Sequence, residues 1–219
     1  MSRSQRAGFW ARWALRDARS RWIQVLSISL LLALGVGMYS GMSSMRDWRT
    51  SSARASFGEL RMHDLRLSLP EGSFVRQGAL MDALQRSSPR AEILSAAERL
   101  VVPTQVDASA AGRSIIVPGR LVGAPVGTRV DTRDVTLGRG LTGADDGRPA
   151  AELEQNFAQH YDLPASGVIR LPGGRSLRYV GQAGAPEYFI VTTPGADFGA
   201  EANFAVLFTT LRTAQRLGG

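Results

Sequence analysis

The sequence predicts an α+β protein that carries one membrane-spanning helix near its N-terminus, and two observations lead to this fold class. The first is an uncharged run of 24 residues between Arg21 and Arg46. As a helix it would cover roughly 36 Å, more than the hydrocarbon core of a bilayer, which is about 30 Å thick. The second is the rest of the chain, in which short apolar runs alternate with turn residues and a few helical segments. We therefore expect a transmembrane helix over 22–45 and a mixed α+β domain over 46–219.

Arginine supplies all 26 basic side chains, and these are unevenly distributed along the chain. Residues 1–21 hold six arginines and one acid, whereas residues 46–219 hold 20 arginines and 18 acids. A positive excess beside an apolar run is typical of the cytoplasmic side of a membrane segment, so we expect no nucleic-acid partner. A content of 44% apolar and 21% charged residues argues against a disordered tail, a collagen-like repeat and a multi-span membrane protein.

Tryptophan marks both ends of the apolar run. The four tryptophans of the chain lie within its first 48 residues: Trp10, Trp13, Trp22 and Trp48. Such rings are typical of the bilayer interface, which predicts a basic interfacial segment over 1–21. The arginine excess predicts that this segment lies on the cytoplasmic side of the plasma (inner) membrane and that the domain is extracytoplasmic. The charge rule alone favours this orientation only slightly, because the arginines within fifteen residues of the run number four before it and three after it. The alternative is a cleaved signal peptide, whose apolar part is usually shorter, about 7 to 15 residues.

The apolar run also has a face of small side chains. Ser29, Ala33, Gly37 and Gly41 recur every fourth residue, and the last two form a GxxxG motif. Small residues at this spacing let a second helix approach closely, which predicts a helix-packing face; the alternative is a chance occurrence in an apolar segment. The chain holds no second apolar run of spanning length, so we expect the packing helix to come from another polypeptide or from a missing part of this one.

The domain over 46–219 is expected to contain short strands and three helices. Residues 62–69 alternate leucine with polar residues, which predicts a half-buried strand followed by a turn at 70–72. Further strands are expected at 99–106, 114–122, 168–171, 177–180, 188–192 and 204–208, and helices at 77–86, 152–161 and 211–217. The helix at 152–161 is alternatively a strand that passes into a helix.

Two hairpins are expected, one between the strands at 99–106 and 114–122 and the other between the strands at 168–171 and 177–180. Pro103 and Pro118 predict that both strands of the first hairpin lie nearer an edge or a bulge than the centre of the sheet. Thr210 caps the last helix, and no strand returns after it, which predicts that the domain is incomplete at its C-terminal end.

The sequence predicts no catalytic, cofactor-binding or metal-binding residue. Residues 138–143 match GxGxxG, but the turn at 144–149 prevents the helix that a nucleotide fingerprint needs. The two histidines, His63 and His160, lack the spacing of a metal-ligand set, and His160 is expected at the surface of a helix end. Residues 145–147 are expected to form a polar turn rather than a calcium loop, and neither a GxSxG nor a Walker A motif occurs.

Four segments carry a resemblance to a known family. They are Ala14 to Trp22, Leu137 to Leu141 with Asp145, Asn156 to Ala158 with Tyr161 and Leu163, and Phe208 to Leu217. In this order and spacing they resemble the N-terminal part of ABC transporter permeases of the MacB/FtsX/LolC type. The last segment is similar to the strand-then-helix element of the periplasmic core domain of that family.

The resemblance implies a non-enzymatic permease, or a fragment of one, with a MacB-like core domain outside the cytoplasm. This domain would transmit ATPase-driven motion to export or extract a substrate. The implied partners are a separate ABC ATPase subunit, a second permease subunit and the lipid bilayer. The family has further spans that are absent here, so the chain is a fragment, a truncated product or a single-span relative. A single-span anchored binding or adaptor protein and a membrane-anchored hydrolase are the alternatives, and no feature of the sequence indicates a substrate.

Overall fold

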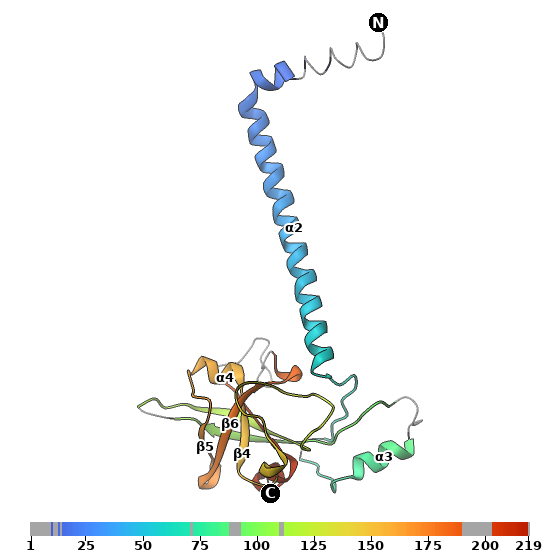
Figure 1. Cartoon of the computed structure of the whole chain (residues 1–219), viewed down its shortest axis with the longest axis vertical. Helices are drawn as coiled ribbons and strands as arrows, with labels where there is room; N and C mark the ends of the chain where they lie inside the picture. Colours follow the sequence, from blue (N-terminus) through green and yellow to red (C-terminus); the bar gives the residue numbers. More distant parts are fainter. Residues whose placement is uncertain are drawn as a thin grey trace. The chain divides into compact units, whose positions relative to one another are not determined.

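The structure is a computed structural model that describes residues 10, 13, 15–70, 72–87, 93–109, 112–189 and 203–218. The chain forms two compact units, Met1–Ala55 and Ser56–Gly219. The first is helical and the second combines a sheet with short helices, so the expected α+β class with an N-terminal helix is confirmed (Figure 1). Residues 1–9, 11, 12 and 14 of the expected interfacial segment lie outside the described residues.

The helix α2, Trp22–Glu59, contains the whole apolar run. Among the described residues it is the one helix that is long and apolar enough to cross a membrane, with a mean hydropathy of 1.8 over its most apolar window. The helix continues past Met45, where the uncharged run ends, because neither proline nor glycine follows until Gly58. Within this extension the Thr50 hydroxyl donates to the Arg46 carbonyl at 2.9 Å.

In the described residues, the second unit contains the end of α2, seven strands and three further helices. The strands are β1 Leu100–Asp107, β2 Ile116–Ala124, β3 Asp134–Gly138, β4 Ala150–Glu154, β5 Gly167–Leu171, β6 Arg175–Gly184 and β7 Ala205–Thr210. The helices are α3 Ala79–Ser87, α4 Gln155–His160 and α5 Leu211–Gly218, with 3-10 turns η1 Gly143–Asp145, η2 Pro172–Gly174 and η3 Pro186–Tyr188.

The sheet closes on itself. Its strand order is β3-β6-β4-β7-β2-β1-β5, and β5 pairs in addition with β6, so β6, β4, β7, β2, β1 and β5 form a ring. The first half of β6 pairs with β5 and its second half with β3. Both expected hairpins, β1 with β2 and β5 with β6, are confirmed as antiparallel pairs.

The described residues form two buried hydrophobic clusters, and α4 contributes to the larger one. Phe157 and Ala158 of this helix are fully buried against Leu153 of β4 and its neighbours. The Glu154 carboxylate caps the helix by accepting from the backbone N–H groups of Asn156 and Phe157, both at 2.8 Å. Residues 152–161 are therefore a strand that passes into a helix, which was the alternative expectation.

The expected strand at 62–69 is wrong. Leu65 and Leu67 are each 75% exposed, and this stretch pairs with no strand in the described part of the chain. Alternation of leucine with polar residues supplies a face for burial, but a strand also needs a neighbour to satisfy its backbone N–H and carbonyl groups.

Two further details differ from expectation. β2 lies inside the sheet between β1 and β7, and it tolerates Pro118 because its pairing with β7 begins one residue later, at Gly119. Tyr188 belongs to η3 instead of a strand, and residues 190–192 of that expected strand lie outside the described residues. The short edge strand β3 was not expected, whereas β7 and α5 are confirmed, and the Thr210 hydroxyl accepts from the Thr213 N–H at 3.3 Å as the expected cap.

Candidate functional site

Five charged or polar side chains from four separate segments meet on one side of the sheet domain. We call them the ion cluster: His63, Arg66, Arg99, Asp131 and Glu187. Arg99 lies at its centre, where one nitrogen of its guanidinium donates to Asp131 and another to Glu187. The side chains of Arg99, Asp131 and Glu187 are only 17%, 4% and 9% exposed, so this is a largely buried arrangement of two acids around one arginine.

Each segment of the cluster has a distinct place in the fold. His63 and Arg66 follow the end of α2, Arg99 immediately precedes β1, Asp131 lies in the connection from β2 to β3, and Glu187 lies in η3 after β6. Asp131 has a φ of +48°, a left-handed conformation in which aspartate is tolerated better than most residues. The cluster therefore joins the start of the sheet to the chain that leaves α2.

Backbone hydrogen bonds attach the chain after α2 at the same place. The N–H of Asp131 donates to the Arg61 carbonyl at 2.9 Å, and the N–H of Thr132 donates to the Leu60 carbonyl at 2.8 Å. The His63 N–H and its ring Nδ1 both contact the Asp131 carboxylate at 2.9 Å. Because an ionised carboxylate only accepts, Nδ1 carries the hydrogen. Residues 60–63 are thus hydrogen-bonded to the sheet domain through both backbone and side chains.

An aromatic contact adds to this attachment. The Phe57 ring, in the last turn of α2, stacks on Phe189 with a centroid separation of 5.6 Å and an angle of 23°. Phe189 follows η3, two residues after Glu187 of the ion cluster. The turn that ends α2 and the turn that follows β6 are therefore in contact within the second unit.

The ligand atoms of His63, Asp131 and Glu187 lie within 4.8 Å of one another, a spacing that a divalent metal could use. The carboxylate oxygens are already engaged, however. The oxygens of Asp131 accept from His63 and Arg99, and those of Glu187 accept from Arg66, at 3.2 Å, and from Arg99. A dication here would face two guanidinium charges, so the donor set fits a network of ion pairs better than a metal centre.

Sequence reasoning missed the ion cluster and had no local signal for it. His63 and Asp131 are 68 residues apart, Arg99 and Asp131 are 32 apart, and Arg99 and Glu187 are 88 apart. No short motif links residues at such separations. The other histidine, His160, lies exposed at the end of α4 with its ring edge on Tyr161, as expected.

Residues of the Leu137 to Leu141 segment shape the loop between β3 and β4. The two guanidinium nitrogens of Arg139 donate to the two oxygens of Asp145 at 2.8 and 2.9 Å. These hydrogen bonds, with further ones from Thr142, hold the pKa of Asp145 well below its usual range. The buried Glu152 accepts from the Leu141 N–H at 2.7 Å and pairs with Arg133. The segment is therefore held by Asp145 at Arg139 and by Glu152 at Leu141.

The predicted helix-packing face lies on α2 at the expected spacing. Ser29, Ala33, Gly37 and Gly41 are all exposed in the described chain. A Cβ atom placed on Gly37 or Gly41 would meet no atom within 4 Å. The face is therefore open to a second helix. Helix packing at this face stays a prediction.

No protein-family model matches the chain, and no curated protein matches it. Among solved structures, the chain is similar to the extracellular domain of the noncanonic ABC-type transporter YknZ from Gram-positive bacteria. The two are 15% identical, the match covers 72% of this chain and 73% of that chain, and the TM-score is 0.42. Transport is a property of that protein, and the similarity is too low to carry it over to this chain.

Replacement of the central arginine of the ion cluster should destabilise the sheet domain strongly. Arg99→Gln leaves Asp131 and Glu187 buried without their shared counter-charge, which costs about 3–5 kcal/mol of unfolding free energy. Arg66→Gln is the matched control, because Arg66 is 49% exposed and its pair with Glu187 contributes about 1 kcal/mol or less. Urea unfolding of the full chain in mild detergent, followed by circular dichroism, measures both. Equal losses in the two variants would contradict a central role for Arg99.

The pair of Arg139 and Asp145 should contribute stability that depends on pH. The pKa of Asp145 is lowered on folding, so the contribution is complete above its unfolded pKa, about 3.9, and is lost as the pH falls below that value. Asp145→Asn should therefore cost about 2 kcal/mol at pH 7 and clearly less at pH 3. Asp146→Asn is the control, since Asp146 is 37% exposed and lies 3.4 Å from Arg212. A loss for Asp145→Asn that is the same at both pH values would exclude the ion pair as its cause.

Proposed function

We propose that the chain is a permease subunit of an ABC transporter, or part of one, in the plasma (inner) membrane. Residues 1–21 would lie in the cytoplasm and residues 46–219 outside it. Three features support this proposal: the apolar helix α2, the arginine excess that precedes it, and the order of the segments that resemble MacB/FtsX/LolC-type permeases.

The ion cluster is the observation on which the proposed mechanism depends. It ties the residues after α2 to Arg99 before β1, to Asp131 before β3 and to Glu187 after β6. These strands belong to one hydrogen-bonded sheet that closes on itself, so a displacement at the cluster would move the sheet as a unit. In the proposed transporter, ATP is hydrolysed in a separate ATPase subunit, and movement of the spanning helix passes through the cluster to the extracytoplasmic domain. The role of this chain is then mechanical and not enzymatic.

The helix-packing face would bring α2 against a helix of a second permease subunit. Gly37 and Gly41 support this role because nothing in the described chain covers them. The alternative function is a single-span anchored adaptor that recruits a partner through its domain. Leu65 and Leu67 favour the alternative, since they offer exposed apolar surface beside the ion cluster.

Substitution on the packing face distinguishes the two functions. We expect the full chain, purified from the membranes of its own host, to carry with it an ATP-hydrolysing subunit and a second permease subunit. Gly37→Leu should reduce their recovery at least tenfold, because the added side chain separates the helices. Gly35→Leu is the control, since Gly35 lies on the opposite side of α2 and adds the same side chain to the same apolar segment.

Recovery is measured by mass spectrometry of the purified complex and by its ATPase activity. Loss with Gly37→Leu and retention with Gly35→Leu support the permease. Equal recovery of the partner subunits with both variants would contradict the permease proposal and favour the anchored adaptor. Absence of an ATP-hydrolysing subunit from the purified natural chain would do the same.

A further inference from the structure

A pocket of about 610 Å³ opens on the sheet domain, and none of its lining residues belongs to the ion cluster. It lies between the loop that joins β3 to β4, the turn that precedes β5, and β6. Its polar lining consists of Arg139, Asp145, Arg148, Ser166 and Arg178. The volume is within the range of small-molecule sites, about 300 to 1,000 Å³.

The lining is strongly positive, with three arginines against one carboxylate. Both oxygens of that carboxylate, Asp145, are already taken by Arg139. For Arg148 and Arg178, no hydrogen bond or ion pair engages either guanidinium group among the residues that the structure describes. The pocket therefore presents two guanidinium groups whose charge no neighbouring carboxylate neutralises.

The backbone beneath these arginines is fixed before any ligand arrives. The Arg148 carbonyl accepts from the Thr213 hydroxyl at 2.6 Å, and the Arg178 N–H donates to the Pro149 carbonyl at 2.9 Å. Both arginines thus project from backbone that is hydrogen-bonded to neighbouring elements, and their side chains are exposed to an incoming ligand.

One glycine allows the pocket floor to close. Gly138 has a φ of +79°, and a Cβ atom there would lie 2.7 to 2.9 Å from backbone atoms of Val180, Gly181 and Ala165. Three chain segments therefore approach one another closely at this point, and their backbone forms a rigid base for the pocket.

We propose that this pocket binds the phosphate group of a small anionic ligand. Arg148 and Arg178 would donate to the phosphate oxygens through their planar forks, a geometry that suits bidentate phosphate binding. The charge of Arg139 is balanced by Asp145, so this pair shapes the edge of the pocket, and the Ser166 side chain offers a further hydroxyl donor. Free inorganic phosphate and a phosphate ester such as a glycerophosphate headgroup share this chemistry. Ligand binding here goes beyond the proposed permease function and does not depend on it.

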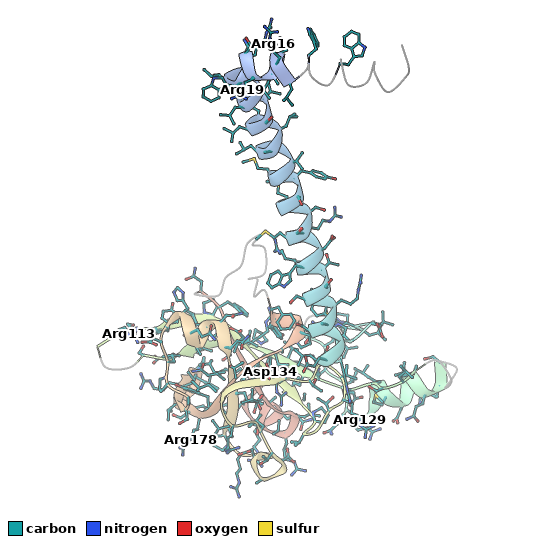
Figure 2. All side chains as sticks on the ribbon, turned by 45° about the horizontal axis from the view of Figure 1, so that its top comes forward. Arg16, Arg19, Arg113, Arg129, Asp134 and Arg178 are labelled. Atoms are coloured by element: carbon teal, nitrogen blue, oxygen red, sulfur yellow. The ribbon has the colours of Figure 1, made fainter. Side chains whose placement is uncertain are left out.

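Isothermal titration calorimetry of the full chain in a neutral detergent, at 150 mM sodium chloride, tests the proposal. Inorganic phosphate and glycerol 3-phosphate are titrated separately into the natural chain and into Arg148→Gln, Arg178→Gln and Arg129→Gln. Arg129 is the matched control, because it is an exposed arginine outside the pocket and lies well apart from Arg178 (Figure 2). Circular dichroism checks that each variant is folded.

We expect one saturable site per chain, a dissociation constant at least tenfold higher in each of the two pocket variants, and an unchanged constant in Arg129→Gln. Tighter binding of inorganic phosphate would identify free phosphate as the source, and tighter binding of glycerol 3-phosphate would identify an ester headgroup. Absence of saturable binding for both probes would overturn the proposal. Equal weakening in Arg129→Gln would overturn it as well, because binding would then reflect overall charge.

Discussion

One arginine shared between two buried carboxylates is the interaction on which the rest of the sheet domain depends. Asp131 lies near the middle of the domain sequence and Glu187 follows β6. Their carboxylates are buried together because Arg99 donates to both, with Arg66 as a second partner of Glu187. Their positions in turn fix the connection from β2 to β3 and the turn after β6. The same carboxylate of Asp131 receives His63, so the end of α2 is held by the group that stabilises the sheet.

The closed sheet explains why such an attachment could matter for function. β6 is long enough to pair with β4 on one side and with both β5 and β3 on the other, which joins the hairpins into one hydrogen-bonded body. The core inside this ring is filled by large side chains such as Leu153 and Phe157, which are fully buried. In the proposed permease, this rigidity lets a displacement at the ion cluster move the sheet as one body.

Local patterns in the sequence predicted those elements whose partners follow closely in the chain. The hairpin of β1 and β2 was predictable because two β-branched runs flank one short polar loop. The alternation at 62–69 failed because it specifies a face and not a partner, and Leu65 and Leu67 remain exposed. The ion cluster could not be predicted because the pairs that link its four segments are 32 to 121 residues apart and meet only when the sheet has closed. The arginine-lined pocket was missed for the same reason, since Arg148 lies in the connection from β3 to β4 and Arg178 lies in β6.

Hydrogen exchange at two backbone amides measures most directly whether the ion cluster holds the end of α2. The N–H groups of Asp131 and Thr132 donate to the carbonyls of Arg61 and Leu60. In the natural chain we expect both amides to be protected to nearly the same extent as those of β7. In Arg99→Gln their protection should fall at least tenfold more than that of β7. Amides that exchange freely in the natural chain, or that keep their protection when Arg99 is replaced, would contradict the account.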